Sequence, residues 1–347
     1  MLGGLIHRDT LKAFGIAVAG AGAFLAAGLP LPFLFGPMAA CLAAALAGVR
    51  MRGAGKLGDG MRTILGLAVG ASITPALMAQ VPVMALTLAL MPVYVALIGL
   101  IGVPFFRYVW GFDRPTSYFA AMPGGLQDMV IFGIEAGGDA RALSLIHATR
   151  LLLVVILAPV LLSGLQGVSL DAPVGVPAAQ VPLSDLVLLV FAAIVGWKGG
   201  ERVGLFGASI LGPMIVATAL SLGGVLHNRP PAEAINVAQV FIGMGIGVHF
   251  AGVTWRELSR DVAAGAVFGV ILAALAVVFT ALAYRLGGAP AVEAFLSFAP
   301  GGQAEMAVIA IVIGADLGFV VLHHITRVVL VILGAPFVAR AALGPRK

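Results

Sequence analysis

Two short stretches, Pro123-Gly124-Gly125-Leu126-Gln127-Asp128-Met129 and Pro300-Gly301-Gly302-Gln303-Ala304-Glu305-Met306, lie 177 residues apart and share the pattern P-G-G-x-x-[DE]-M. A Pro followed by two Gly ends regular helix, so each stretch predicts a break in a helical segment. The same spacing relates landmarks further along the chain, which predicts an internal duplication. The further matched pairs are Asp139 and Asp316, His147 and His324, Arg150 and Arg327, and Pro159 and Pro336.

The composition of the chain is that of a membrane protein. Of its 347 residues, 61% are hydrophobic and 10% are charged, and the mean hydropathy is +1.10, whereas soluble domains carry about 45–50% apolar and about 25% charged residues. Apolar stretches of about 20 residues, enough to cross a hydrocarbon layer about 30 Å thick, recur along the whole chain. We therefore expect an all-α polytopic membrane protein whose first apolar segment is retained as a helix.

The duplication divides the chain into two membrane repeats, residues 1–165 and 182–347, joined by a linker at 166–181. In each repeat, the hydropathy pattern predicts five ordinary transmembrane helices and one segment interrupted by Pro-Gly-Gly. The ordinary helices are expected at 11–29, 32–49, 63–80, 82–105, 141–165, 182–197, 203–225, 235–254, 262–285 and 317–340, and the interrupted segments at 117–138 and 292–314.

The distribution of Lys and Arg favours opposite orientations for the two repeats, because cytoplasmic loops retain positive charge. If each interrupted segment is re-entrant and returns to the face it entered, the second repeat is inverted. In that case 16 basic residues lie on the cytoplasmic side and 2 lie outside. If the interrupted segments cross the membrane, the repeats are parallel and the count is 13 against 5. We therefore expect inverted repeats, with both termini in the cytoplasm.

The Pro-Gly-Gly turns are the leading candidates for a binding site. Inverted repeats with broken helices at matching positions are typical of secondary transporters, whose sites lie where two broken helices meet near the midplane. Helix ends freed at Gly124, Gly125, Gly301 and Gly302 would present N–H groups to an anion. The alternative is a packing kink without a ligand, which a duplication would copy equally well.

Asp128 and Glu305 each follow the last Gly of a turn by three residues. A carboxylate near the centre of a bilayer costs about 2.5–3.5 kcal/mol unless it is paired or hydrated. We expect these two to carry the coupling ion, a proton or sodium; the alternative is a carboxylate hydrogen-bonded to the broken backbone or lying in a wet interface. Gln127 and Gln303 lie beside them, one position out of register, and are candidate donors lining a cavity.

His147 and Arg150, like His324 and Arg327, are three residues apart and so project from one side of a helix. Arg150 would lie about 16 Å along its helix, near the middle of the membrane, where an arginine needs an anionic partner. One interpretation is an anionic substrate held by the guanidinium groups. The other is a permanent ion pair with one of the carboxylates that follow the turns.

Other repeated residues have structural interpretations. Asp139 and Asp316 stand directly at expected helix starts, where an Asp is usually an N-cap. The patterns Gly66-x-x-x-Gly70 and Gly243-x-x-x-Gly247 place small residues on one helix face, which allows two helix backbones to approach closely.

Several classes of function lack their signatures in the sequence. Cys41 is the only cysteine and His323-His324 lacks further ligands, so no metal site is expected. The net charge is +5, but the basic residues lie in short loops where they orient helices, so we expect no binding of nucleic acid. No nucleophile elbow, phosphate-binding loop or dinucleotide fingerprint is present, and we expect neither an enzyme nor a cofactor.

The paired P-G-G-x-x-[DE]-M and H-x-x-R blocks, together with the Gly-Pro-Met repeated at 36–38 and 212–214, resemble the AbrB family of bacterial membrane proteins over nearly the whole chain. Members of that family are labelled as regulators of gene expression or as ammonia monooxygenase. The sequence has no cluster of His and carboxylate ligands for copper or iron, so it does not support an oxygenase. The layout of spans looks like that of elevator-type glutamate and citrate carriers, an analogy of architecture alone.

These observations predict a secondary transporter for a small anionic solute, coupled to protons or sodium, in the bacterial inner membrane. The lipid bilayer, the solute and the coupling ion are its expected partners, and whether the chain forms a homodimer is left open. The rival class is a membrane-embedded sensor or regulator, which would change gene expression without changing solute flux.

Overall fold

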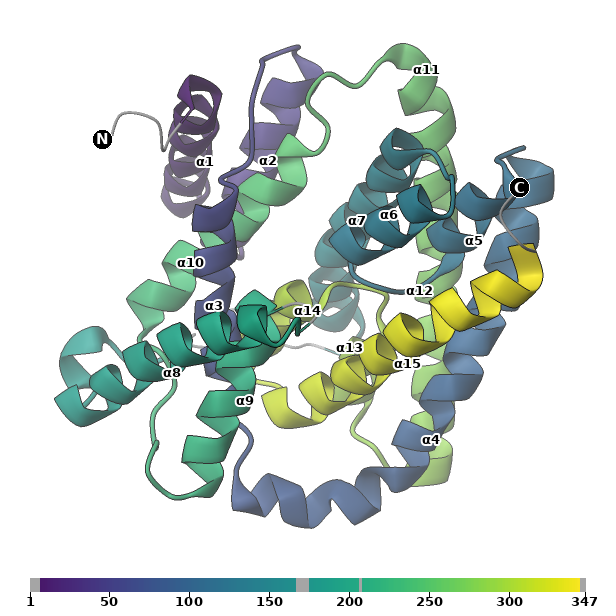
Figure 1. The fold of residues 1–347 in the computed structure, drawn as a ribbon. Helices are drawn as coiled ribbons and strands as arrows, with labels where there is room; N and C mark the ends of the chain where they lie inside the picture. The colour runs from purple at the N-terminus through teal and green to yellow at the C-terminus, as the bar shows by residue number, and fades with distance from the viewer. Residues whose placement is uncertain (1–6, 167–174, 206–207, 344–347) are drawn as a thin grey trace. The chain divides into compact units, whose positions relative to one another are not determined.

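A computed structural model describes residues 7–166, 175–205 and 208–343, apart from some side chains inside helices, among them those of Gln127 and Asp128. Within these ranges all regular structure is helical, and no strand is present (Figure 1). The first half of the chain forms α1 (Arg8–Ala26), α2 (Pro32–Leu46), α3 (Lys56–Gly70), α4 (Pro75–Pro104), η1 (Phe105–Val109), α5 (Arg114–Ala121), α6 (Leu126–Glu135) and α7 (Ala140–Gln166). The second half forms η2 (Ala178–Gln180), α8 (Leu183–Arg202), α9 (Ala208–Leu222), α10 (Ala232–Val248), α11 (Trp255–Glu257), η3 (Leu258–Val262), α12 (Ala263–Gly287), α13 (Ala291–Phe298), α14 (Gln303–Val312) and α15 (Leu317–Leu343).

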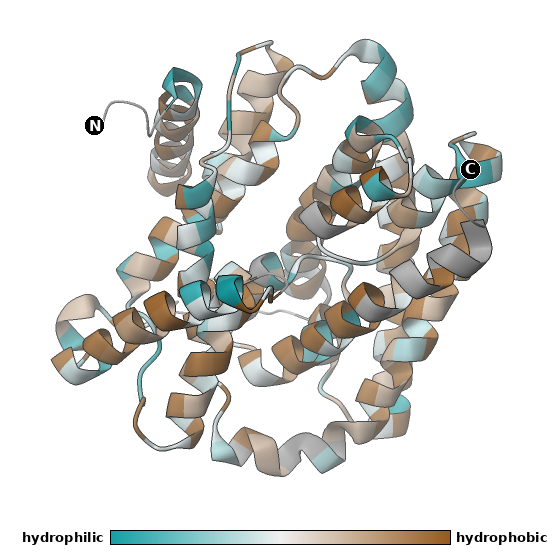
Figure 2. Cartoon of the chain, in the orientation of Figure 1, coloured by the Kyte–Doolittle hydropathy of each residue, from teal (hydrophilic) through white to brown (hydrophobic). Residues whose placement is uncertain are grey.

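Five helical stretches among the described residues are long and apolar enough to cross a membrane: Arg8–Ala26, Met84–Val109, Ala140–Gly164, Leu183–Arg202 and Trp255–Gly287. Helix α8 is largely hydrophobic in Figure 2, and large apolar side chains along it are exposed. Lipid chains are the medium that suits such a face. The chain therefore has the features of a helical membrane protein. The exposed side chains of α8 include Val187, Val190, Phe191 and Ile194.

Most of the predicted helices are present, but the helix expected at 63–80 is wrong at both ends. Helix α3 begins earlier, at Lys56, and ends at Gly70; a turn follows before α4 begins at Pro75. The side chain of Thr74 accepts a hydrogen bond from the backbone N–H of Leu77 and so caps the start of α4. A proline is favoured at the first position of a helix, and Pro75 therefore marks the start of α4.

The helices group into two compact units, and each unit takes residues from both halves of the chain. Unit 1 contains the described residues of 1–81, 167–252 and 307–318; unit 2 contains those of 82–166, 253–306 and 319–347. Half of the predicted linker, residues 167–174 of 166–181, lies outside the described residues. The division by folding units therefore differs from the division by sequence halves.

In unit 1, helices from the two halves pack directly on each other at the glycines of the Gly-x-x-x-Gly patterns. A Cβ added at Gly66 of α3 would meet the backbone of Ile210 in α9, and one added at Gly243 of α10 would meet the backbone of Leu34 in α2. Gly70 and Gly247 are equally tight against α9 and α2. The packing role expected of these glycines is confirmed.

The repeated Gly-Pro-Met has a corresponding explanation in unit 1. Gly36 of α2 lies against the backbone of Gly20 in α1, and Gly212 of α9 lies against the backbone of Gly196 in α8. Each Gly-Gly crossing lets two helix backbones touch where any side chain would separate them.

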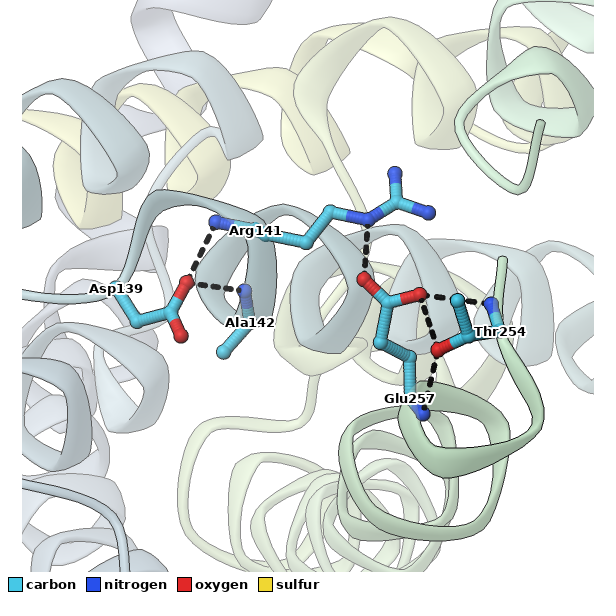
Figure 3. Close-up of polar contacts among 5 residues, drawn as sticks. All are labelled: Asp139, Arg141, Ala142, Thr254 and Glu257. Carbon is cyan, nitrogen blue, oxygen red and sulfur yellow. Dashed lines mark hydrogen bonds and ion pairs between the residues drawn. The ribbon is translucent and has the colours of Figure 1, made fainter. Parts of the chain in front are cut away.

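In unit 2, polar contacts fix the start of α7, the helix that carries His147 and Arg150 (Figure 3). Oδ1 of Asp139 accepts hydrogen bonds from the backbone N–H groups of Arg141 and Ala142, at 2.9 and 3.0 Å, so the predicted N-cap is confirmed. The Nε of Arg141 donates to Oε1 of Glu257 at 2.8 Å. Glu257 also forms a capping box with Thr254 at the start of α11.

We expect Glu257→Ala to lower the free energy of unfolding by about 1–2 kcal/mol, because it removes both the capping box and the ion pair with Arg141. Glu257→Gln should cost only about 0.5 kcal/mol, since glutamine keeps the cap. Denaturation of the purified protein in detergent measures both. The matched control is Glu201→Ala, which breaks an exposed pair with Lys198; equal losses in all three variants would contradict the assigned cap.

Candidate functional site

Each Pro-Gly-Gly stretch interrupts a helix in unit 2, as predicted. Helix α5 ends at Ala121, Met122 is extended, and α6 begins after Gly125, which takes the N-cap position without a side-chain cap. Helix α13 ends at Phe298, Ala299 leaves the helical region with ψ at 132°, and α14 begins at Gln303. Each break leaves backbone carbonyl groups without helical partners, and a buried break must satisfy them in another way.

The two buried arginines satisfy these carbonyls. The guanidinium of Arg150 donates from Nη1 to the carbonyl of Met122 at 3.1 Å and from Nη2 to that of Gly124 at 2.8 Å. Arg327 donates from Nη1 to the carbonyl of Ala299 at 2.7 Å and from Nη2 to that of Gly301 at 2.6 Å. The side chains are 1% and 2% exposed. Each guanidinium thus bridges the end of one helix and the Gly of the turn.

Backbone carbonyls as partners differ from both interpretations of the arginines given by the sequence, an anionic substrate and a permanent ion pair. Among the described side chains, no ion pair joins Arg150 or Arg327 to a carboxylate. The Nε of each is buried and has no hydrogen-bond partner within the described part of the chain. Both η nitrogens of each guanidinium therefore bind backbone carbonyls.

The two histidines bind the same helices one turn earlier. Nε2 of His147 lies 3.1 Å from the carbonyl of Phe119, and Nε2 of His324 lies 2.9 Å from that of Leu296. A carbonyl only accepts, so in both rings Nε2 carries the proton and Nδ1 is an acceptor. In the second half, Nη2 of Arg327 donates to Nδ1 of His324 at 2.8 Å. In the first half, Nδ1 of His147 is buried without a partner among the described residues.

The donors and the acceptors both correspond at the spacing of 177 residues. Phe119 and Leu296, Met122 and Ala299, and Gly124 and Gly301 are related by the same offset as the histidines and arginines that bind them. The H-x-x-R and P-G-G patterns therefore belong to one local structure, in which the later helix ties down the break in the earlier one.

Packing at the breaks accounts for both methionines of the P-G-G-x-x-[DE]-M pattern and for the position of Glu305. A Cβ at Gly124 would meet the side chain of Met129 at 2.6 Å, and one at Gly301 would meet Met306 at the same distance. A Cβ at Gly302 would overlap the carboxylate of Glu305. The glycines therefore leave room for side chains of the following helix to fold back over the turn.

Glu305 places a carboxylate beside the second break, at the N-terminus of α14. Glu305 is 8% exposed. It lies within electrostatic range of Arg150, which also interacts electrostatically with Arg327 and Tyr94. The hydroxyl of Tyr94 donates to the carbonyl of Phe298, at the end of α13. The two guanidinium groups and one carboxylate thus lie near one another in unit 2.

The remaining predicted site residues are placed less fully. Gly125 is the N-cap of α6, and Gln303 is the first residue of α14. The side chains of Gln127 and Asp128 lie outside the described residues, so their expected roles stay predictions. Among the described side chains, no group of three or more His, Cys, Asp or Glu residues is placed to hold a metal ion.

Two tyrosines take part that sequence reasoning missed. Tyr94 holds the end of α13, and the hydroxyl of Tyr118 in α5 donates to the carbonyl of Ala335 at 2.9 Å. Neither has a tyrosine at the equivalent position of the other half, so the internal comparison carries no signal for them.

Comparison with known proteins gives a family and two relatives. The family model described as "Transition state regulatory protein AbrB" matches residues 33–342. "Uncharacterized protein YhjN" of Bacillus subtilis (strain 168) is 30% identical over 247 residues, a match that spans 66% of this chain and 64% of that protein, less than two thirds of its length. "Putative regulator AbrB" of Escherichia coli (strain K12) is 24% identical over 325 residues, which is 91% of each chain.

Proposed function

We propose that this chain, which belongs to the AbrB family, is a secondary transporter for a small anionic solute, coupled to protons or sodium, in the bacterial inner membrane. The observation that carries the proposal is the pair of broken helices in unit 2, each closed by a buried arginine. In a bilayer, irregular backbone is tolerated only where it is buried in protein or lines a wet cavity. Paired breaks of this kind are typical of transporter sites.

The electrostatics of the breaks favour an anion as the solute. Arg150 and Arg327 keep their charge at any physiological pH, and Glu305 is the carboxylate described near them. The N-terminus of α14 adds the positive end of a helix dipole. We assign Gly124, Gly125, Gly301 and Gly302 to the solute site.

We further propose that the two halves are inverted repeats and that α5–α6 and α13–α14 are re-entrant segments. The equal offsets of the histidine and arginine contacts support a common local structure, and the excess of Lys and Arg in the loops assigned to the cytoplasm supports the inversion. In this arrangement both termini are cytoplasmic.

Labelling of single cysteines tests the orientation. In a Cys41→Ser background, Ala178→Cys should react with a membrane-impermeant maleimide from the periplasm, and Lys198→Cys only after the inner face is opened. The wild type, whose single cysteine, Cys41, is buried, serves as the unreactive control. Reaction of residue 178 from the cytoplasm and residue 198 from the periplasm would establish parallel repeats instead.

Transport is tested with the purified protein in liposomes loaded with a panel of radiolabelled small anions: mono-, di- and tricarboxylates and inorganic phosphate. We expect saturable exchange of at least one of them across the membrane. The rival function is a membrane-embedded regulator, as the E. coli relative is named. Absence of exchange for every anion, together with altered gene expression on deletion of the gene, would favour the regulator.

A further inference from the structure

We propose that the exposed side of α8 in unit 1 binds an anionic phospholipid, whose acyl chains lie along the apolar part of the helix and whose phosphate lies against Lys198 and Arg202 at its end. This inference concerns unit 1 alone and does not depend on the proposed transport function. It combines an exposed apolar stripe, basic side chains that continue the stripe, and a difference in charge between the two ends of the helix.

The exposed side of α8 is apolar over most of its length. Its side chains Val187, Val190, Phe191 and Ile194 are each 50–60% exposed, and they follow the spacing of one helix face. The opposite side packs on α9, because a Cβ added at Gly196 would overlap the backbone of that helix. Helix α8 has 20 residues, enough to cross a hydrocarbon layer about 30 Å thick. Acyl chains therefore match this side of α8 in polarity and in length.

The same side of α8 becomes basic in its last turns. Lys198 follows Ile194 by four residues, Arg202 follows Lys198 by four, and both basic side chains are exposed. The Nζ of Lys198 lies 4.6 Å from the ring centre of Trp197, and Trp is typical of the level at which lipid headgroups lie. Glu201 is the acidic residue of these turns. Its pair with Lys198 is exposed, and such pairs contribute little to stability, so a phosphate can replace the carboxylate.

Neighbouring segments of unit 1 add positive charge at this end of α8. The start of α3 lies against the end of α8, since a Cβ added at Gly60 would lie 3.4 Å from the ring of Trp197. The loop before α3 lies in turn against the start of α1, where the backbone N–H of Arg52 donates to the carbonyl of Asp9 at 3.3 Å. Eight basic and three acidic residues belong to these segments, which are 8–12, 50–62 and 197–202.

The other end of α8 lacks this excess of positive charge among the described residues. Oδ2 of Asp185 accepts a hydrogen bond from the backbone N–H of Asn228, and Oε2 of Glu233 accepts one from that of Ala178. The segments joined there, 175–185 and 227–233, carry two acidic residues and one basic residue, Arg229. An anionic phospholipid has its apolar and charged parts in the order in which α8 presents their partners. Free phosphate would match the basic end alone.

The test uses the purified full-length protein in an uncharged detergent, with the midpoint of thermal unfolding as the readout. The two probes share the same acyl chains: dioleoylphosphatidylglycerol is anionic, and dioleoylphosphatidylcholine carries no net charge. At equal concentration, we expect the anionic lipid to raise the midpoint by about 3 °C or more above the value in the other lipid, because it binds the folded protein. Sodium chloride at about 0.5 M should at least halve this difference, because salt screens exposed charges.

Lys198→Gln combined with Arg202→Gln should also at least halve the difference between the two lipids. Arg229→Gln combined with Arg285→Gln removes the same charge from exposed positions elsewhere and is the matched control, which should respond as the wild type does. An equal response of the wild type to both lipids would overturn the proposal, and this measurement needs no variant. So would a difference that the Lys198 and Arg202 variant keeps in full. A rise of the same size with glycerol phosphate, which has no acyl chains, would establish a site for free phosphate instead.

Discussion

Replacing either buried arginine by glutamine is expected to lower the free energy of unfolding by about 3–5 kcal/mol. Arg150→Gln leaves the carbonyls of Met122 and Gly124 without their donors, and Arg327→Gln does the same for Ala299 and Gly301. An unsatisfied buried backbone group costs about 1–3 kcal/mol, and each variant creates two of them. The yield of folded protein after gel filtration and the midpoint of thermal unfolding measure the loss.

Arg285→Gln, at the exposed end of α12, is the control and should change stability by less than about 0.5 kcal/mol. A double-mutant cycle distinguishes hydrogen bonds from Arg150 to backbone carbonyls from an ion pair between Arg150 and Glu305. If Glu305→Gln restored the stability of Arg150→Gln, the dominant partner of Arg150 would be the carboxylate, and the role assigned to the backbone carbonyls would be wrong.

The second large effect is expected in unit 1. Gly243→Ala should destabilise the protein by about 3 kcal/mol or more, because its Cβ would overlap the backbone of Leu34 and would force α10 away from α2. Backbone atoms of a packed helix cannot move aside as the end of a side chain can. The loss of stability therefore exceeds that of ordinary overpacking. Gly66→Ala, against Ile210 of α9, should behave in the same way.

Gly245, two residues along the same helix, provides the matched control because nothing lies within 4 Å of the position of its Cβ. Gly245→Ala should stabilise the protein by about 0.5–1 kcal/mol through the lower entropy of the unfolded chain. Thermal unfolding of the variants in detergent measures the difference. Equal stability of Gly243→Ala and Gly245→Ala would show that α2 and α10 do not pack as described.

Local features of the fold were predictable where one residue type dictates the backbone. The breaks between α5 and α6 and between α13 and α14 follow from Pro-Gly-Gly, and the start of α7 follows from the cap at Asp139. The break between α3 and α4 was not predicted, because residues 63–80 are mostly apolar and carry no charge, and hydropathy does not register a single capping threonine before Pro75.

Non-local features were less accessible. The internal duplication identifies Arg150 and Arg327 as special. From the sequence, however, we expected an arginine inside a membrane to have an anion as its partner. The actual acceptors are carbonyls 26 and 28 residues earlier in the chain, and any residue type supplies a carbonyl. The grouping of helices from both halves into each compact unit depends on contacts between segments far apart in sequence, which a repeat pattern does not encode.

The roles of the two halves follow from these contacts. In unit 2 the H-x-x-R helix and the Pro-Gly-Gly break of each half form one hydrogen-bonded structure, so a break keeps its shape without continuous helix. Arginine side chains of the protein donate hydrogen bonds to the carbonyls at each break. The N–H groups that follow each break lie at the start of a helix of ten residues.

The most direct test of the account is the rate of anion exchange in liposomes by the wild type, Gly301→Ala and Gly245→Ala, with the anion that exchanges fastest in the panel of carboxylates and phosphate. The Cβ of Gly301→Ala would meet the buried side chain of Met306 at the second break, so gel filtration first establishes that each variant is folded. The account predicts exchange by the wild type and Gly245→Ala, and a loss of at least about tenfold in Gly301→Ala. Equal exchange by all three proteins, or none by the folded wild type, would contradict it.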